Sequence, residues 1–125
     1  MRKIYLAGPY SSPDAKVREE RFRSLNAKAG ELIKAGYVVF SPISHAHSIA
    51  EQCELPKGWE FWREYCESFV EWADEVQVLM LEGWMDSVGV KAEVEVALRL
   101  KKAVNFVGGA YPVDRERVIL AATWR

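Results

Sequence analysis

A serine, a glycine and two acidic residues stand where a strongly apolar run gives way to an amphipathic segment. The apolar run is 76–81, and Asp86, Ser87, Gly89 and Glu93 follow it. Serine is a typical helix N-cap, so we expect a helix to begin at Ser87, with Glu93 about one and a half turns in. A helix start offers free backbone N–H groups and a positive dipole end, both of which suit an anion such as phosphate. The spacing predicts a small-molecule site that holds an anionic group beside a carboxylate able to act as nucleophile or base.

The elements that must position these residues alternate along the chain. Short apolar or β-branched runs predict strands, and apolar residues every three or four positions predict helices. The expected strands are 3–7, 37–40, 76–81 and 103–107. The expected helices run from Asp14 to a stop at Gly36, from Trp59 to Ala73, and from Ser87 to about Lys102.

Two segments have no clear periodicity. Residues 41–57 contain two histidines and two prolines, and we expect a long loop there, which in a small domain is often functional. Residues 117–122 could be a fifth strand or a segment that docks on the domain.

The alternation of strands and helices predicts an α/β fold. We expect one domain over residues 1–125, with a mostly parallel sheet of four to five strands flanked by helices, of the Rossmann or flavodoxin type. Such sheets bind ligands beyond the carboxyl ends of their strands, near the switch in strand order. Segments 8–10, 41–47 and 83–89 each follow a strand, so they should converge on one mouth.

Composition narrows the classes of partner. The 125 residues carry a formal net charge of −1, which excludes the strongly basic surface of a general nucleic-acid binder. No apolar run approaches the roughly 20 residues of a membrane helix, and the first residues lack a signal-peptide pattern. We therefore expect a cytoplasmic protein whose partner is a small molecule. Of its two cysteines, Cys66 falls on the apolar side of a helix and is expected to be a buried free thiol.

Two motifs resemble those of the nucleoside 2-deoxyribosyltransferase superfamily. The run Tyr-Leu-Ala-Gly-Pro-Tyr at 5–10 resembles its first strand and loop. The pattern Ser87-x-Gly89-x-x-x-Glu93-x-x-x-Ala97 resembles its catalytic signature. The superfamily includes deoxyribosyltransferases, deoxynucleoside 5′-monophosphate N-glycosidases and pyrimidine-nucleotide hydrolases. The resemblance covers the chain to about residue 107 and implies a homo-oligomer, a dimer or a tetramer, that needs no metal or organic cofactor.

Glu93 is the nucleophile that this resemblance implies. The chemistry supports it separately, because cleavage of an N-glycosidic bond develops oxocarbenium-like charge at C1′, which a carboxylate can stabilise or capture as an ester. The alternative is a solvated helix glutamate paired with Lys91 or Arg99. Glu95 lies two residues on, points elsewhere, and is expected at the surface.

The residues at the helix start each have two interpretations. Ser87 is either an N-cap only, or also binds a 5′-phosphate together with the N–H groups of Val88 and Gly89. Deoxyribosyltransferases tend to carry a sugar-binding aspartate at this position, so a serine favours nucleotides over nucleosides. Asp86 is either a substrate-binding residue or a turn former. Gly89 either permits close approach of a ligand or eases packing of the helix start.

The resemblance also assigns roles outside this helix. It places Tyr5 near the sugar and the nucleophile, although a tyrosine in a short strand can equally be core. It implies that Asp74 helps to orient the substrate and the leaving base. Asp74 should, however, lie at the opposite end of its strand from the mouth, unless a helix end or a neighbouring subunit brings it close. Gly8 and Pro9 shape the loop beside Tyr5, and Tyr10 could stack on a base or cover the pocket.

The remaining candidates are aromatic or histidine side chains. A metal site would need a third ligand beside His45 and His47, so we expect none, and His45 is a candidate to contact phosphate or base, or else to brace its loop. Trp84, in the motif loop, is a candidate to stack on a base. Helix tryptophans such as Trp59 and Trp62 are expected in a core or a subunit interface.

The expected function is cleavage or transfer of an N-glycosidic bond on a nucleotide or nucleoside. The alternative is a nucleotide or ADP-ribose-type binding module without turnover, which has no need of a carboxylate at position 93. A phosphoryl-transfer enzyme is disfavoured because the chain has neither a Gly-rich Lys-Ser/Thr loop nor a Cys-x5-Arg loop.

Overall fold

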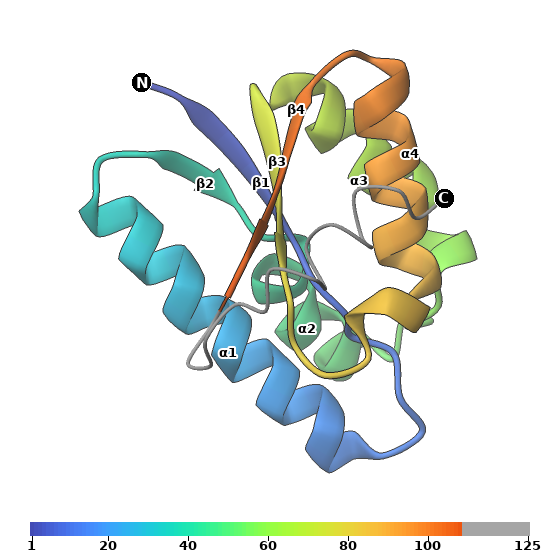
Figure 1. Cartoon of the computed structure of the whole chain (residues 1–125). Coiled ribbons are helices and arrows are strands. Elements are labelled where there is room, and N and C mark those ends of the chain that lie inside the picture. The colour runs from blue at the N-terminus through green and yellow to red at the C-terminus, as the bar shows by residue number, and fades with distance from the viewer. Residues whose placement is uncertain (109–125) are drawn as a thin grey trace.

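The computed structural model describes residues 1–108, which form three layers (Figure 1). The central layer is an all-parallel sheet with strand order β2-β1-β3-β4. The strands are β1 (Lys3–Ala7), β2 (Val38–Phe40), β3 (Glu75–Leu79) and β4 (Ala103–Val107). The helices are α1 (Ala15–Lys34), α2 (Pro42–Cys53), α3 (Trp59–Trp72) and α4 (Val88–Arg99), with a short 3-10 helix, η1 (Trp84–Asp86), before α4. The predicted single-domain α/β fold is confirmed.

Each face of the sheet is covered by different helices. Helix α1 packs on one face, and α3 and α4 pack on the other (Figure 1). Alternation along the strands supplies both cores, since neighbouring side chains point to opposite faces. Tyr5, Val76 and Val78 enter the core under α3 and α4, whereas Ile4 and Leu6 enter the core under α1.

The two inner strands define the switch in strand order. The chain passes from β1 outward to β2 on one side, and from β3 outward to β4 on the other. The switch therefore lies between β1 and β3, where Ala7 is paired with Val78 near the carboxyl ends. This is the position where open α/β sheets bind ligands. Strand β3 ends at Leu79, two residues before the predicted end.

Helix α1 begins and ends at the predicted signals. The Asp14 carboxylate caps its start by accepting the N–H of Lys16 at 2.9 Å. Gly36, just beyond its end, has a φ of 100°, a conformation that glycine adopts without strain. Leu25 is fully buried on the face that packs against the sheet, whereas Ile33 is 57% exposed. Successive residues of a helix are rotated by about 100°, so Ile33 points away from the sheet although the preceding residue, Leu32, is buried against it.

The predicted loop over 41–57 is wrong, because most of it is α2. Ser41 is the N-cap and accepts the N–H of Ser44, and Pro42 occupies the first turn, where its missing N–H is tolerated. The buried face of the helix uses Pro42, His47 and Ala50 in place of large aliphatic residues. The spacing of large apolar residues therefore did not reveal α2. The Ser41-Pro42 pair, however, is a start signal from which this helix could have been predicted.

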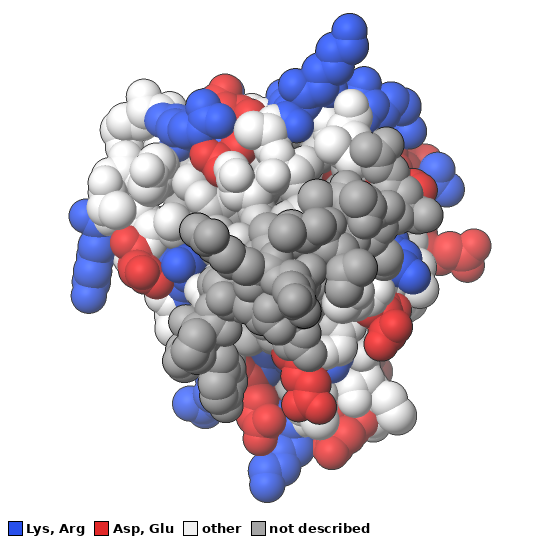
Figure 2. All heavy atoms as spheres, in the orientation of Figure 1, with Lys and Arg blue, Asp and Glu red and all other residues white. Residues whose placement is uncertain are grey.

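Charges are mixed at the surface. Figure 2 shows acidic and basic side chains around the rim of the visible face, in keeping with the net charge of −1. Among residues 1–108, no helix has both the length and the apolar character needed to cross a membrane. The possible fifth strand at 117–122 lies outside the described residues.

Candidate functional site

A cavity of about 670 Å³ lies at the carboxyl ends of the strands. The loop after β1, helix α2, the start of α3 and the segment around the start of α4 all contribute to its lining. The predicted convergence of 8–10, 41–47 and 83–89 is confirmed. The volume is within the range of small-molecule sites.

Glu93 lines this cavity and is almost completely buried, with 5% of its surface exposed. The Tyr5 hydroxyl donates a hydrogen bond to its Oε2. Burial raises the pKa of the Glu93 carboxyl to about 8, against a smaller opposing effect of this hydrogen bond. The alternative of a solvated helix glutamate is therefore wrong, whereas Glu95 is exposed as expected.

Two further side chains complete what we call the buried cluster, Tyr5, Cys66 and Glu93. Tyr5 has no exposed surface, and its pKa is raised by burial and by the nearby Glu93. Cys66 is the expected buried free thiol, and its pKa is raised to about 12, chiefly by burial. A thiol with this pKa stays protonated and unreactive, so the chemistry of the cluster falls to the carboxyl group.

The start of α4 presents hydrogen-bond donors to the same cavity. Ser87 caps the helix by accepting the N–H of Val90 at 3.2 Å, and within residues 1–108 its hydroxyl proton has no protein acceptor. Within residues 1–108, the N–H groups of Val88 and Gly89 have no protein acceptor. Asp86 also contributes to the lining and is exposed. The expected grouping of Asp86, Ser87 and Gly89 beside Glu93 is present.

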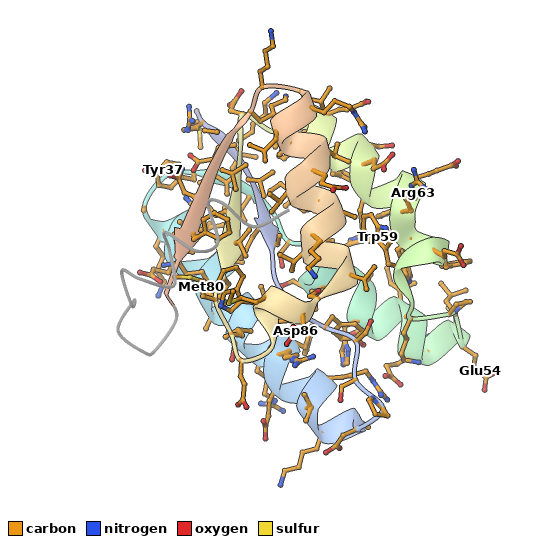
Figure 3. All side chains as sticks on the ribbon, turned by 45° about the vertical axis from the view of Figure 1, so that its right-hand side comes forward. Tyr37, Glu54, Trp59, Arg63, Met80 and Asp86 are labelled. Carbon is orange, nitrogen blue, oxygen red and sulfur yellow. The ribbon has the colours of Figure 1, made fainter. Side chains whose placement is uncertain are left out.

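Gly89 faces the space beside the carboxyl group. A Cβ at this position would lie 3.5 Å from the Trp59 ring and 3.7 Å from Glu93 Oε1, which are ordinary contacts. Figure 3 shows Trp59 between α3 and α4, and Asp86 at the end of α4 where that helix begins. Because a Cβ would fit here without a clash, packing of the helix start does not require glycine at position 89. The surroundings therefore favour the other interpretation, that the glycine permits close approach of a ligand.

Gly8 is explained differently. A Cβ at Gly8 would lie 2.8 Å from Cδ2 of Leu25. The absence of a side chain at Gly8 therefore lets α1 pack against the end of β1. Pro9 is buried beside it, and both residues line the cavity as expected.

A second polar group at the cavity joins three elements. The Tyr10 hydroxyl lies 2.6 Å from His47 Nδ1, and His47 Nε2 lies 3.0 Å from Glu19 Oε2. We call Tyr10, Glu19 and His47 the histidine cluster. The His47 ring also stacks on Phe22, with ring centroids 4.2 Å apart.

The structure brings His47 to the cavity and leaves His45 outside it, where His45 fits the bracing alternative. His45 is exposed, bonds to the Tyr65 hydroxyl at 2.6 Å and is absent from the cavity lining, whereas His47 is part of it. Residues two apart on a helix point in nearly opposite directions, and α2 was expected to be a loop, so that distinction could not be made.

The sequence pointed to the wrong tryptophan. Trp84 is 2% exposed and packs in the core, with its ring centroid 5.5 Å from that of Phe106. Trp59 and Trp62 line the cavity instead, at the start of α3. Trp62 is anchored there by a bond from its Nε1 to the Pro56 carbonyl at 2.7 Å.

Asp74 is not brought to the site in this chain. It lies just before β3, at the end of the sheet opposite the cavity, and is exposed. Its carboxylate accepts the N–H of Lys3 at 2.8 Å, and this bond is the main cause of its lowered pKa. Asp74 therefore lies at the far end of its strand, as the direction of the strand requires, and not at the site that the resemblance implies.

Two cationic side chains in the lining were missed by sequence reasoning. Arg21 projects from α1 and bonds to the carbonyls of Ser11, at 2.9 Å, and Glu82, at 3.1 Å. Lys57 also lines the cavity, and its Nζ lies 3.9 Å from Glu51 Oε1. Arg21 stands four residues before the buried Leu25, a spacing that could have placed it on the same face of α1. Among the described residues, no group of three or more possible metal ligands was found.

Comparison with known proteins supplies the family. No curated protein matches the chain at a significant level. A family model described as a domain of unknown function, DUF1937, matches residues 2–108 and so spans every helix and strand described above. This chain therefore belongs to the DUF1937 family.

Proposed function

We propose that this protein breaks an N-glycosidic bond of a nucleotide or nucleoside, with Glu93 as the nucleophile. The observation that carries the proposal is a buried glutamate at a 670 Å³ cavity, held by the Tyr5 hydroxyl beside the start of a helix. A carboxylate that is kept from water and held rigidly can stabilise a positive charge that develops on a ligand during the reaction.

The reaction has two steps. Glu93 forms a bond to C1′ while the bond from C1′ to the base nitrogen breaks and its electron pair leaves with the base. Tyr5 holds the attacking carboxylate in place. Water then attacks C1′ of the glycosyl ester and releases Glu93, or a second base does so in a transfer reaction.

The surroundings favour a nucleotide as the substrate. The N–H groups of Val88 and Gly89 and the Ser87 hydroxyl offer donors to a phosphate at the positive end of α4. Arg21 and Lys57 add positive charge to the lining. Trp59, Trp62 and Tyr10 offer aromatic surface for a base.

The same burial that defines the site governs its pH dependence. With a pKa of about 8, Glu93 is mostly protonated in the free protein at neutral pH, and only its ionised form can attack C1′. The proposal therefore requires base release to increase as pH rises from 6 towards 8.

The test is release of free base from a panel of nucleoside 5′-monophosphates and nucleosides, followed by chromatography. Wild-type protein should release base, and Glu93→Gln should lose this activity while keeping its fold. Glu95→Gln is the matched control, because Glu95 is an exposed glutamate on the same helix. No release at high protein concentration, or release by Glu93→Gln at the wild-type rate, contradicts the proposal.

The second candidate is a nucleotide or ADP-ribose-type binding module without turnover. The observation that favours it is again the pKa of about 8, since a protonated Glu93 can bind a ligand but cannot attack it. Thermal stabilisation by nucleotides without any product would support this candidate.

The location and the oligomeric state of the protein are also proposals. We propose a cytoplasmic homo-oligomer, a dimer or tetramer, acting on a small molecule. If Asp74 takes part at all, a neighbouring subunit must supply it, because within one chain it lies at the opposite end of the sheet. Sedimentation of the wild-type protein would determine the oligomeric state.

A further inference from the structure

The histidine cluster is built as a chain of hydrogen bonds that ends at the cavity. Glu19 on α1 contacts His47 on α2, and His47 contacts Tyr10 in the loop after β1, at 3.0 and 2.6 Å. His47 is 8% exposed and its ring stacks on Phe22, which restricts its rotation. Tyr10 and His47 line the cavity, whereas Glu19 does not.

The order of the partners determines where the protons lie. Because Glu19 is a carboxylate, it accepts from Nε2 of His47, which must carry a proton. Nδ1 of a neutral His47 then accepts from the Tyr10 hydroxyl. When His47 is protonated, Nδ1 donates to the Tyr10 oxygen instead, which leaves the Tyr10 O–H proton for another acceptor in the cavity.

The proposed reaction needs such a proton. A base that leaves with the electron pair of the N-glycosidic bond is a poor leaving group unless its ring is protonated. Asp74, which the resemblance linked to the leaving base, is at the opposite end of the sheet. Glu60 and Asp86 reach the lining but are exposed, and neither has a bonded relay behind it in the described residues.

We propose that Tyr10 is the catalytic acid that protonates the leaving base, with His47 as its proton source and Glu19 as the residue that positions His47. This inference rests on the proposed N-glycosidic function. As the bond to C1′ breaks, the Tyr10 O–H proton passes to a ring nitrogen of the base. The Nδ1 proton of His47 passes to the Tyr10 oxygen, and neutral His47 keeps its Nε2–H bond to Glu19. In the second step, a proton of the attacking water returns to His47.

Several charged groups surround this relay. Glu19 and Arg18 approach it from α1, and Glu51 approaches it from α2. Burial raises the pKa of Tyr10, with Glu51 adding to the rise and Arg18 opposing it. The hydroxyl therefore keeps its proton at neutral pH until a base accepts it.

The test compares two leaving groups. An unmodified purine nucleotide requires protonation of the base, whereas an N7-methylated purine nucleotide already carries a positive charge and leaves without an acid. Tyr10→Phe and His47→Asn should lower kcat for the unmodified nucleotide by about 100-fold or more and should change kcat for the methylated one by less than about threefold. Glu19→Gln should have the same selectivity with a smaller loss, about tenfold.

The pH profile provides a second measurement. Because the proposed relay passes a proton through His47, wild-type kcat/KM on the unmodified nucleotide should have a pH dependence that differs from that of His47→Asn. His45→Asn is the matched control, since His45 is exposed on the same helix and outside the lining, and it should behave as wild type.

The outcomes separate the two proposals. Wild-type protein that releases neither base overturns the function and the relay together. Release that Tyr10→Phe and His47→Asn leave unchanged, or lower equally for both nucleotides, overturns the relay and leaves the role of Glu93 in place.

Discussion

The buried cluster and the histidine cluster both contain a tyrosine and a carboxyl group, in very different surroundings. In the buried cluster, Tyr5 and Glu93 contact each other directly and both are kept from water. In the histidine cluster, a ring separates Tyr10 from Glu19, and Glu19 is 44% exposed at its side chain.

This difference in solvation distinguishes the two carboxyl groups. Burial raises the pKa of Glu93 to about 8 despite the hydrogen bond from Tyr5, because the negative form is kept from water. Glu19 keeps contact with solvent, and its Oε2 lies 3.0 Å from His47 Nε2. Two carboxyl groups near one cavity thus lie in different environments, which suits one to the proposed role of nucleophile and the other to that of a hydrogen-bond partner for His47.

The largest expected effect is on turnover through the buried cluster. Glu93→Gln keeps the size of the side chain and an oxygen for the Tyr5 hydroxyl, but removes the nucleophile. We expect the rate of base release to fall by about 1,000-fold or more, with KM little changed, because the lost bond forms only during reaction. A fall of less than tenfold in a steady-state assay would place the nucleophile elsewhere.

The same substitution should raise stability, with a defined pH dependence. The Glu93 pKa is near 4.3 in an unfolded chain and about 8 in the folded one, so between these values the folded state holds more protons. Wild-type stability should therefore fall as pH rises from about 4 to about 8. Glu93→Gln should melt at least about 5 °C above wild type at pH 9 and close to it at pH 4. Equal melting temperatures at both pH values, measured by calorimetry, would contradict the burial of an ionisable Glu93.

A smaller effect is expected where the protein leaves room beside that carboxyl group. Gly89→Ala places a methyl group 3.7 Å from Glu93 Oε1 without a protein clash. It should stabilise α4 by about 0.5–1 kcal/mol through helix propensity, and weaken substrate binding about tenfold by occupying ligand space. Gly30→Ala is the control. Gly30 is also a helix residue, on α1, and a Cβ there would meet nothing within 4 Å. A Gly89→Ala protein that is more stable and equally active would show that the ligand does not use this space.

The smallest effect on folding is expected in the histidine cluster. Glu19→Gln removes a partly exposed ion pair, so the free energy of unfolding in urea should change by less than about 1 kcal/mol. A loss above about 2 kcal/mol would mean that Glu19 is structural, and would remove the contrast with the buried cluster.

The sequence predicted those parts of the fold that depend on local signals. The four strands were visible as apolar or β-branched runs, α1 was visible through the spacing of its apolar residues, and α4 was visible through Ser87 as its cap. Glu93 was expected at the mouth because strand ends and helix starts of an α/β sheet converge on one edge. The contact between Tyr5 and Glu93 was implied only by the resemblance, and the full burial of Tyr5 agrees with the core alternative as well.

Side-chain direction was the part that local patterns could not supply. Helix α2 was missed because His47 and Ala50 serve as its buried residues. Without that helix, His45 and His47 could not be told apart. Trp84 and Trp59 were exchanged for a similar reason, since only tertiary packing decides which of them enters the core.

The distance along the chain between Tyr5 and Glu93 has a consequence for synthesis. These residues are 88 positions apart, yet their side chains share a hydrogen bond. The contact can form only after β1, β3 and α4 have all been made and assembled, and contacts of this separation form slowly. A nascent chain that stops before α4 therefore has a first strand but no nucleophile. In the proposed enzyme, turnover would report that the chain has been synthesised and folded as far as α4.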